Sequence, residues 1–249
     1  MAYTTGDTIL DDEYNAFATS VNAIWGSGTG DAGYGQTNTV SSVSAGASIT
    51  AAQWATLLTR IASAASHQGS TITSITNPSA GDVIAVLTAL ATNIGTITTN
   101  RLNVHARDSN VTSACSTTTG LTGTIEQRGT WAWGSEDQAR YFFNAGGRVS
   151  ISWDISGYSS NTKADNWNTL AAACGTFIIN AQSSGKSGGS GSANINDTNK
   201  GWHDLSGSYQ TVFRQYEDTG PYTASYIMLE LYKTGGSVLF RSKWVDDAA

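Results

Sequence analysis

Two pairs of neighbouring carboxylates, Glu136 with Asp137 and Glu217 with Asp218, could in principle do acid–base chemistry. Glycoside hydrolysis needs two carboxyl groups about 5–9.5 Å apart across the sugar. Neighbours in a strand point to opposite faces, and two neighbouring carboxylates in a loop are most simply solvated. We therefore expect neither pair to be catalytic and the chain not to be an enzyme.

Two glycine-containing motifs have the spacing of nucleotide-binding loops. Gly28, Gly30 and Gly33 match G-x-G-x-x-G, which binds a pyrophosphate only where it leaves a strand and opens a helix. Here the motif follows a predicted helix and no helix starts after it, so it predicts a tight turn or linker. Gly185-Lys186-Ser187 is similar to the end of a phosphate-binding loop, but Asn180 stands where that loop needs glycine and no helix follows. We interpret it as part of a Gly/Ser-rich loop.

The histidines and cysteines suggest neither a metal nor a cofactor. His67, His105 and His203 are widely separated and share no ligand spacing, so structural roles are expected. Cys115 and Cys174 form neither a metal motif nor a disulfide framework. They are predicted to be free, buried thiols, with a single disulfide left open.

Composition and charge narrow the class of protein. Only 13% of the 249 residues are charged, about half the usual share, and Gly, Ser, Thr, Ala and Asn dominate. Residues 1–100 hold six acidic and one basic side chain, a net −5, and residues 101–249 hold thirteen and twelve, a net −1. A nucleic-acid partner is not expected, because binding needs clustered Lys and Arg. With no apolar run of ~20 residues and no leader pattern, we expect a soluble protein without membrane insertion.

Residues 1–103 are predicted to be helical. Asp11 is predicted to cap a helix whose apolar stripe is made by Tyr14, Phe17, Val21 and Ile24 or Trp25. Thr50 and Gln53 form a capping box, with Ile49 and Trp54 as a hydrophobic staple, and Gly69 ends this second helix.

A third helix is predicted after Pro78, with Ser79 and Asp82 at capping spacing and an end at Gly95. Its stripe is Val83, Leu87, Leu90, Ala91 and Ile94. All three helices are thin in large apolar side chains, each of which contributes about 1.5–3 kcal/mol against about 1–2 kcal/mol per residue of backbone ordering. We infer that this region depends on neighbouring chains.

Residues 104–249 alternate as strands do. A hairpin is predicted within 129–153, turning at Asn-Ala-Gly-Gly, and a second one turns at Gly235-Gly236 between strands at 225–233 and 237–245. Another strand is predicted at 212–216. Asp165 is predicted to cap one helix, whose buried face is Trp167, Leu170, Ala171 and Cys174 and which Gly175 ends before a strand at 176–180. The fold class is therefore α+β: a helical N-terminal region, then an antiparallel β-sandwich or jelly-roll-like domain with one helix.

Residues 181–200 have many glycines and no apolar pattern, which indicates a mobile or binding loop. The tryptophans of the β-rich region are predicted to be core residues, although an exposed one could stack on a sugar or sit at an interface. The candidate residues for a binding loop or interface are Lys186, Asn194, Trp202 and Trp54.

Three blocks of sequence resemble virion structural proteins of tailed bacteriophages, of the tail-fibre and baseplate-associated type. They are YTTGDTILDDEYNAF with the later ITAAQWATLL and HQGS, GTWAWG with RYFFNAGGRVSISW, and Asp165-Asn166-Trp167 with Gly175-Thr176. The resemblance implies assembly in the host cytoplasm, residence in the virion, symmetric multimers such as a homotrimer or higher ring, and no cofactor. Residues 1–103 would then attach or oligomerise, and residues 104–249 would be displayed or cement neighbours. The alternatives are a head decoration protein, an adaptor, a module that binds a host surface glycan, and a depolymerase.

Overall fold

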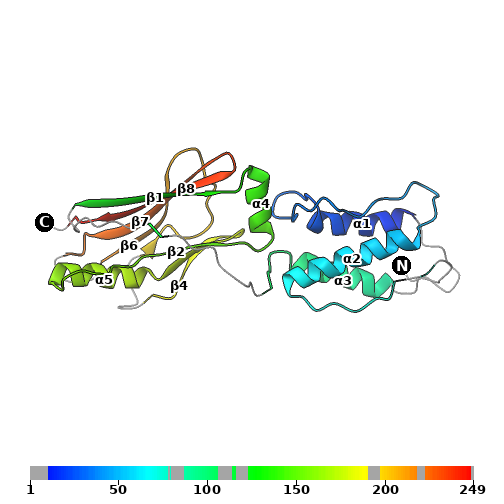
Figure 1. Cartoon of the computed structure of the whole chain (residues 1–249), viewed down its shortest axis with the longest axis horizontal. Helices are drawn as coiled ribbons and strands as arrows, with labels where there is room; N and C mark the ends of the chain where they lie inside the picture. The colour runs from blue at the N-terminus through cyan, green and yellow to red at the C-terminus, as the bar shows by residue number, and fades with distance from the viewer. Residues whose placement is uncertain are drawn as a thin grey trace. The chain divides into compact units, whose positions relative to one another are not determined.

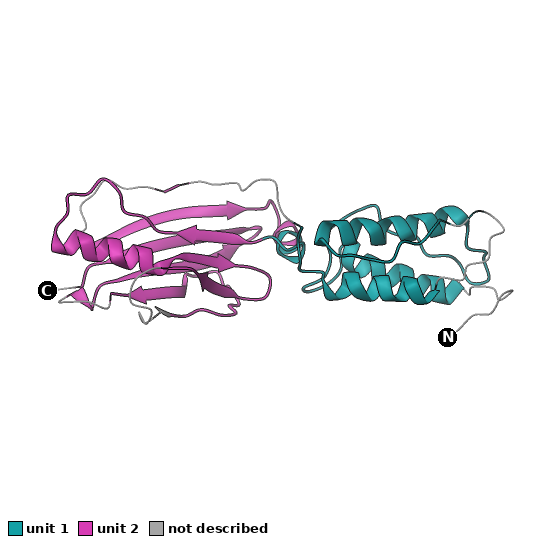
Figure 2. Ribbon diagram, turned by 90° about the horizontal axis from the view of Figure 1, so that it is seen from below, with its two compact units in different colours: residues 1–110, 140–147 teal, residues 111–139, 148–249 magenta. Residues whose placement is uncertain are grey.

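The computed structural model describes residues 11–77, 79, 87–105, 114–115, 123–189, 197–217 and 222–247. The fold is α+β, as predicted (Figure 1). The chain forms two compact units, coloured separately in Figure 2. The helical unit contains Met1–Asn110 and Arg140–Gly147, and the sandwich unit contains Val111–Ala139 and Arg148–Ala249. The chain thus returns to the helical unit at 140–147, a crossing that the single predicted boundary at 103–104 does not include.

Three helices form the frame of the helical unit: α1 (Asp11–Trp25), α2 (Ala51–Gln68) and α3 (Leu87–Thr99). The predicted ends of α2 are confirmed. The Thr50 hydroxyl accepts from the Gln53 amide at 3.2 Å, and the Gln53 side chain accepts from the Thr50 amide at 2.9 Å. Gly69 ends the helix at a φ of 68°, a left-handed conformation that glycine adopts without steric cost.

The predicted end of α3 at Gly95 is wrong, because the helix continues to Thr99 and buries Ile97. A glycine inside a helix costs about 1 kcal/mol relative to alanine, which a buried apolar face outweighs. Ala91, assigned to the stripe, is exposed. The predicted start falls on residues 78 and 80–86, outside the described residues.

Two extended segments, residues 36–49 and 70–77, are tied to the helices of this unit by asparagine side chains; we call them the straps. Asn22 of α1 donates to the Val40 carbonyl and accepts from the Val40 amide, both at 2.8 Å. Asn15 does the same for Val43, at 2.9 and 2.8 Å. Asn93 of α3 does so for Thr73, at 2.9 Å from the amide and 2.8 Å to the carbonyl. Each amide thus satisfies a complete backbone donor–acceptor pair.

The straps add apolar side chains to the helical core. Val40 and Val43 are buried, and Ile72 and Ile75 pack against the same cluster. From the sequence we infer that this helical region depends on neighbouring chains. The straps of the same chain supply part of the apolar contacts that the inference assigns to those neighbours.

The sandwich unit contains a five-stranded antiparallel sheet in the order β1-β8-β7-β6-β5. Its strands are β1 (Thr124–Ala132), β5 (Asp197–Thr198), β6 (Gln210–Tyr216), β7 (Tyr226–Thr234) and β8 (Ser237–Val245). The predicted β7–β8 hairpin is confirmed, with Thr234 opposite Ser237 across Gly235 and Gly236. A three-stranded sheet follows the order β2 (Val149–Ser152), β3 (Thr176–Ile179), β4 (Ser184–Ser187).

Aromatic side chains fill the core of the sandwich unit. The ring of Phe213 on β6 lies 5.4 Å from that of Trp153 and 5.0 Å from that of Phe177 on β3, so it joins the two sheets. Helix α5 (Thr162–Cys174) contributes Trp167, which lies 5.7 Å from Trp244 of β8.

The buried face predicted for α5 is confirmed, and so is its end at Gly175. Its N-cap is Asn161, whose side chain accepts from the Ala164 amide at 3.0 Å. Asp165, predicted as the cap, lies one turn inside the helix, where its carboxylate accepts from Ser160 at 2.9 Å.

The hairpin predicted within 129–153 is wrong. β1 pairs with β8 and β2 with β3, and helix α4 (Glu136–Asn144) lies between them in the chain. Ser135 starts this helix by accepting from the Gln138 amide at 3.1 Å, and the acidic pair that follows suits a first helical turn. The Gly147 amide donates to the Phe142 carbonyl at 2.9 Å, so the predicted turn is a helix end. Trp133 lies one residue beyond the end of β1.

Residues 181–200 are not one unpatterned loop, because they contain β4 and β5. Gly185, Lys186 and Ser187 lie in β4, which corrects the loop expected there. Gly and Ser in this edge strand give no apolar alternation, so period-two patterning could not find it. Residues 190–196 lie outside the described residues.

Candidate functional site

Trp202 is the most exposed large apolar side chain among the described residues, with 71% of its surface accessible. It follows Gly201, which is fixed to the buried Ser184 of β4. The Ser184 amide donates to the Gly201 carbonyl at 2.7 Å, the Gly201 amide donates back at 3.2 Å, and the Ser184 hydroxyl donates at 2.9 Å. This Trp is therefore presented from an anchored backbone.

We call residues 198–203, which contain Trp202, the Trp202 turn. Asn199 has a φ of 68°, the one left-handed residue other than glycine in the described chain. Its carbonyl lies 2.6 Å from the Nε2 of His203, which closes the turn. Backbone strain of this kind is kept where surrounding contacts determine it, and it marks candidate functional positions.

The other predicted interface residues have different surroundings. Lys186 is half-buried on β4, where its ammonium donates to the Gln215 side-chain oxygen at 3.0 Å. Lys186 lies on β4, and the Trp202 turn is hydrogen-bonded to Ser184 of that same strand. Trp54 is 1% exposed in the helical core, 6.2 Å from the ring of Tyr14, so its side chain is not available to a partner. Asn194 lies outside the described residues.

Sequence reasoning missed the outer face of the five-stranded sheet, the face opposite its apolar core. The register places Glu126, Arg128, Arg241, Lys243, Glu230, Met228 and Arg214 side by side across four strands. The Arg241 guanidinium donates to Glu230 at 2.6 Å, and the Lys243 ammonium lies 3.1 Å from the same oxygen. Within each strand, these charged side chains alternate with core residues. To find that they share one face requires the order of the strands in the sheet, which the sequence does not encode.

The electrostatics of the outer face favour the ionised forms of Glu230 and Arg241. Burial raises the pKa of the Glu230 carboxyl, but hydrogen bonds from Arg241 and Lys243, together with their charges, outweigh it and hold that pKa below its ordinary value. The hydrogen bond to Glu230 raises the pKa of Arg241. Arg241 also lies 4.1 Å above the ring of Tyr209.

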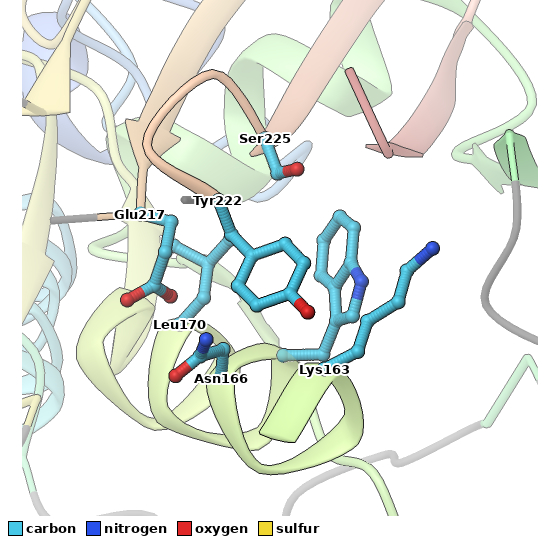
Figure 3. A pocket seen from close by; sticks show the side chains of 7 residues that line it. Lys163, Asn166, Leu170, Glu217, Tyr222 and Ser225 are labelled. Carbon is cyan, nitrogen blue, oxygen red and sulfur yellow. The ribbon is translucent and has the colours of Figure 1, made fainter. Parts of the chain in front are cut away.

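A shallow hollow lies beside α5 (Figure 3). It is lined by Lys163, Asn166, Trp167, Leu170, Glu217, Tyr222 and Ser225. Lys163 is paired with Asp246, whose carboxylate also accepts from Ser225 at 3.5 Å. The hollow encloses no space large enough for a water molecule, far below the roughly 300–1,000 Å³ of small-molecule sites. We do not assign a ligand to it.

The acidic and thiol candidates are dispersed. Glu136 and Asp137 lie exposed in the first turn of α4, and Asp218 lies outside the described residues. Cys174 is buried as expected, whereas Cys115 is exposed, and no disulfide joins the two. The described residues contain no group of three His, Cys, Asp or Glu side chains able to hold a metal ion. Among the described helices, none is both long and apolar enough to span a membrane.

The G-x-G-x-x-G segment forms a turn after α1, as predicted. The Tyr34 amide donates to the Ile24 carbonyl at 2.8 Å, which folds the segment back on the helix. At Gly33, with a φ of 99°, a Cβ atom would lie 2.2 Å from the Ser27 carbonyl oxygen, whereas at Gly30, with a φ of 59°, it would meet nothing. The fixed backbone of Gly33 therefore leaves no room for a side chain.

Gly33→Ala is expected to destabilise the helical unit by about 1–3 kcal/mol more than Gly30→Ala. Both variants place alanine in a left-handed conformation, but only the alanine at position 33 also clashes with neighbouring backbone atoms. Chemical denaturation of both variants measures the difference. Equal losses would contradict the close approach at Gly33.

Comparison with known proteins adds no family assignment. No protein-family model, no curated protein and no solved structure matches this chain.

Proposed function

We propose that the chain is a non-catalytic structural component of a tailed-phage virion, a tail fibre or tail/baseplate-associated protein that acts by assembly and binding. Its partners would be other virion proteins and its own copies, in a homotrimer or higher ring. The observation that carries the binding role is the 71% exposed Trp202 on an anchored turn. Large aromatic side chains presented rigidly are the usual anchors of protein contacts.

The phage assignment is supported by the sequence resemblance and by where its blocks lie. GTWAWG begins in β1 and extends just beyond it, RYFFN closes α4, and VSIS forms β2. These segments build the frame of both units, and none carries a catalytic cluster in the described structure. A rigid frame that presents an exposed aromatic side chain suits a protein that acts by assembly.

Replacing Trp202 by alanine is expected to reduce incorporation into particles by at least about tenfold, because losing a central aromatic anchor costs about 2 kcal/mol or more. Tagged wild-type and variant chains would be expressed during infection, and the tag quantified in gradient-purified particles. Tyr158→Ala is the matched control, since Tyr158 is 37% exposed on the same unit and should be neutral.

Wild-type chain absent from the particles would contradict the virion role. If Trp202→Ala is incorporated as well as the wild type, the virion role stands, but Trp202 is not the contact that attaches the chain to the particle. Immunogold labelling then separates the tail from the head, the location of a decoration protein.

A second candidate, recognition of a glycan on the host surface, is favoured by a different observation. Two tyrosines meet on the outer sheet face with an arginine that has no carboxylate partner among the described residues.

A further inference from the structure

Two arginines on the outer sheet face stack on tyrosine rings, and they differ in one respect. Arg241 of β8 lies over Tyr209 and donates to the Glu230 carboxylate at 2.6 Å. Arg214 of β6 lies 4.8 Å from the centre of the Tyr226 ring and 5.9 Å from that of Tyr216. The register places Arg214 opposite Met228, where β7 offers no carboxylate.

The Arg214 guanidinium is poorly satisfied. Its Nη1 donates to the Tyr216 hydroxyl at 3.2 Å, and its Nη2 lies 3.9 Å from the Met228 sulfur, a weak acceptor. Its Nε is buried and has no hydrogen-bond partner among the residues that the structure describes. Within the described part of the chain, no carboxylate lies within 4.0 Å of this side chain. A half-buried charge without a counter-ion destabilises a fold unless a partner from outside compensates it.

We propose that Arg214, Tyr216 and Tyr226 form a binding site for the carboxylate of an acidic sugar. The ligand carboxylate would pair with the Arg214 guanidinium as the Glu230 carboxylate pairs with that of Arg241. A guanidinium fork matches a planar carboxylate with two parallel hydrogen bonds. The half-buried rings of Tyr216 and Tyr226, 5.2 Å apart, supply an aromatic face and hydroxyl groups for the sugar ring.

Charge on this face is consistent with an anionic ligand. Four cations, Arg128, Arg214, Arg241 and Lys243, stand against two carboxylates, Glu126 and Glu230, in a protein whose net charge is −6. Recognition must therefore come from the local site rather than from the overall field of the protein.

The site is tested by titration calorimetry on the full-length chain at fixed salt. The probes are a glucuronic acid tetrasaccharide and sialyllactose, each with its neutral counterpart, a glucose tetrasaccharide and lactose. The wild type is expected to bind an acidic probe at least about tenfold more tightly than its neutral counterpart, because only the former supplies a carboxylate. Arg214→Met is expected to remove that preference.

Two further measurements separate recognition from folding. Arg128→Gln removes a cation from the same face, but the Arg128 side chain is 64% exposed and already paired with Glu126, so binding should stay within about twofold. The melting temperature of Arg214→Met should equal or exceed that of the wild type, since an uncompensated charge is lost.

Failure of the wild type to prefer either acidic probe would overturn the site. Unchanged binding by Arg214→Met would also overturn it. A glutamate-rich peptide that binds as tightly as the sugars would show that the sugar ring is not recognised, which contradicts the proposal as well. A lower melting temperature for Arg214→Met would assign Arg214 to the fold instead. Provided that Arg214→Met melts no lower than the wild type, its incorporation into particles is expected to stay at the wild-type level, so this test is independent of the virion role.

Discussion

Replacing Asn22 by alanine is expected to lower the free energy of unfolding of the helical unit by about 2–6 kcal/mol. The Asn22 side chain satisfies both the amide and the carbonyl of the buried Val40. Each buried backbone group left without a partner costs about 1–3 kcal/mol, and the variant leaves two. The strap that carries Val40 should then detach from α1, which also exposes part of the apolar core.

Amide hydrogen exchange with mass spectrometry checks this result segment by segment. Protection should fall in α1 and in residues 36–49, while β7 and β8 keep theirs. Ser41→Ala is the matched control, because Ser41 is an exposed neighbour of Val40 on the same strap. If Asn22→Ala behaves like Ser41→Ala, the strap is held by its apolar contacts alone and the asparagine account is contradicted.

Replacing Phe213 by alanine is expected to destabilise the sandwich unit by about 3–5 kcal/mol. Phe213 is fully buried and touches Trp153 and Phe177, so its ring connects the five-stranded sheet to the three-stranded one. Its loss leaves a cavity between two sheets whose other contacts cannot close without moving strands.

Because each unit has its own hydrophobic cluster, the effect of Phe213→Ala should stay within one of them. Exchange protection of β3, β6 and β7 should fall while that of α2 is unchanged. Tyr158→Ala, at an exposed position of the same unit, should leave both unaltered. Loss of protection in α2 would contradict two separate cores.

Sequence patterns predicted those elements whose signals are local. The capping box at Thr50, the left-handed end at Gly69 and the Gly235-Gly236 hairpin depend on residues within a few positions of one another, and the structure confirms each. The hairpin predicted around Asn144 failed because aromatic residues suit a strand and a helix face alike. The helix is decided by Ser135, whose hydroxyl accepts from the Gln138 amide, a local signal that the hairpin prediction does not include.

Long-range structure could not be predicted in this way. The asparagines of α1 and α3 look like ordinary polar residues until the straps place backbone amides and carbonyls beside them. Trp202 was a candidate by residue type, but its anchoring depends on Ser184, 18 positions earlier in the sequence. Arg214 gave no signal, since its distinction from Arg241 is the presence of Met228 rather than Glu230 across the sheet.

The central claim, that the chain is a structural component of a tailed-phage particle, is tested most directly by its copy number. Quantitative mass spectrometry of gradient-purified particles, with an isotope-labelled standard of this chain, measures that number. We predict a fixed copy number per particle that is a multiple of the symmetry of the tail structure, three for a single trimeric fibre. A chain absent from the particles, or present at amounts that vary between preparations and fall with each purification step, would contradict the claim.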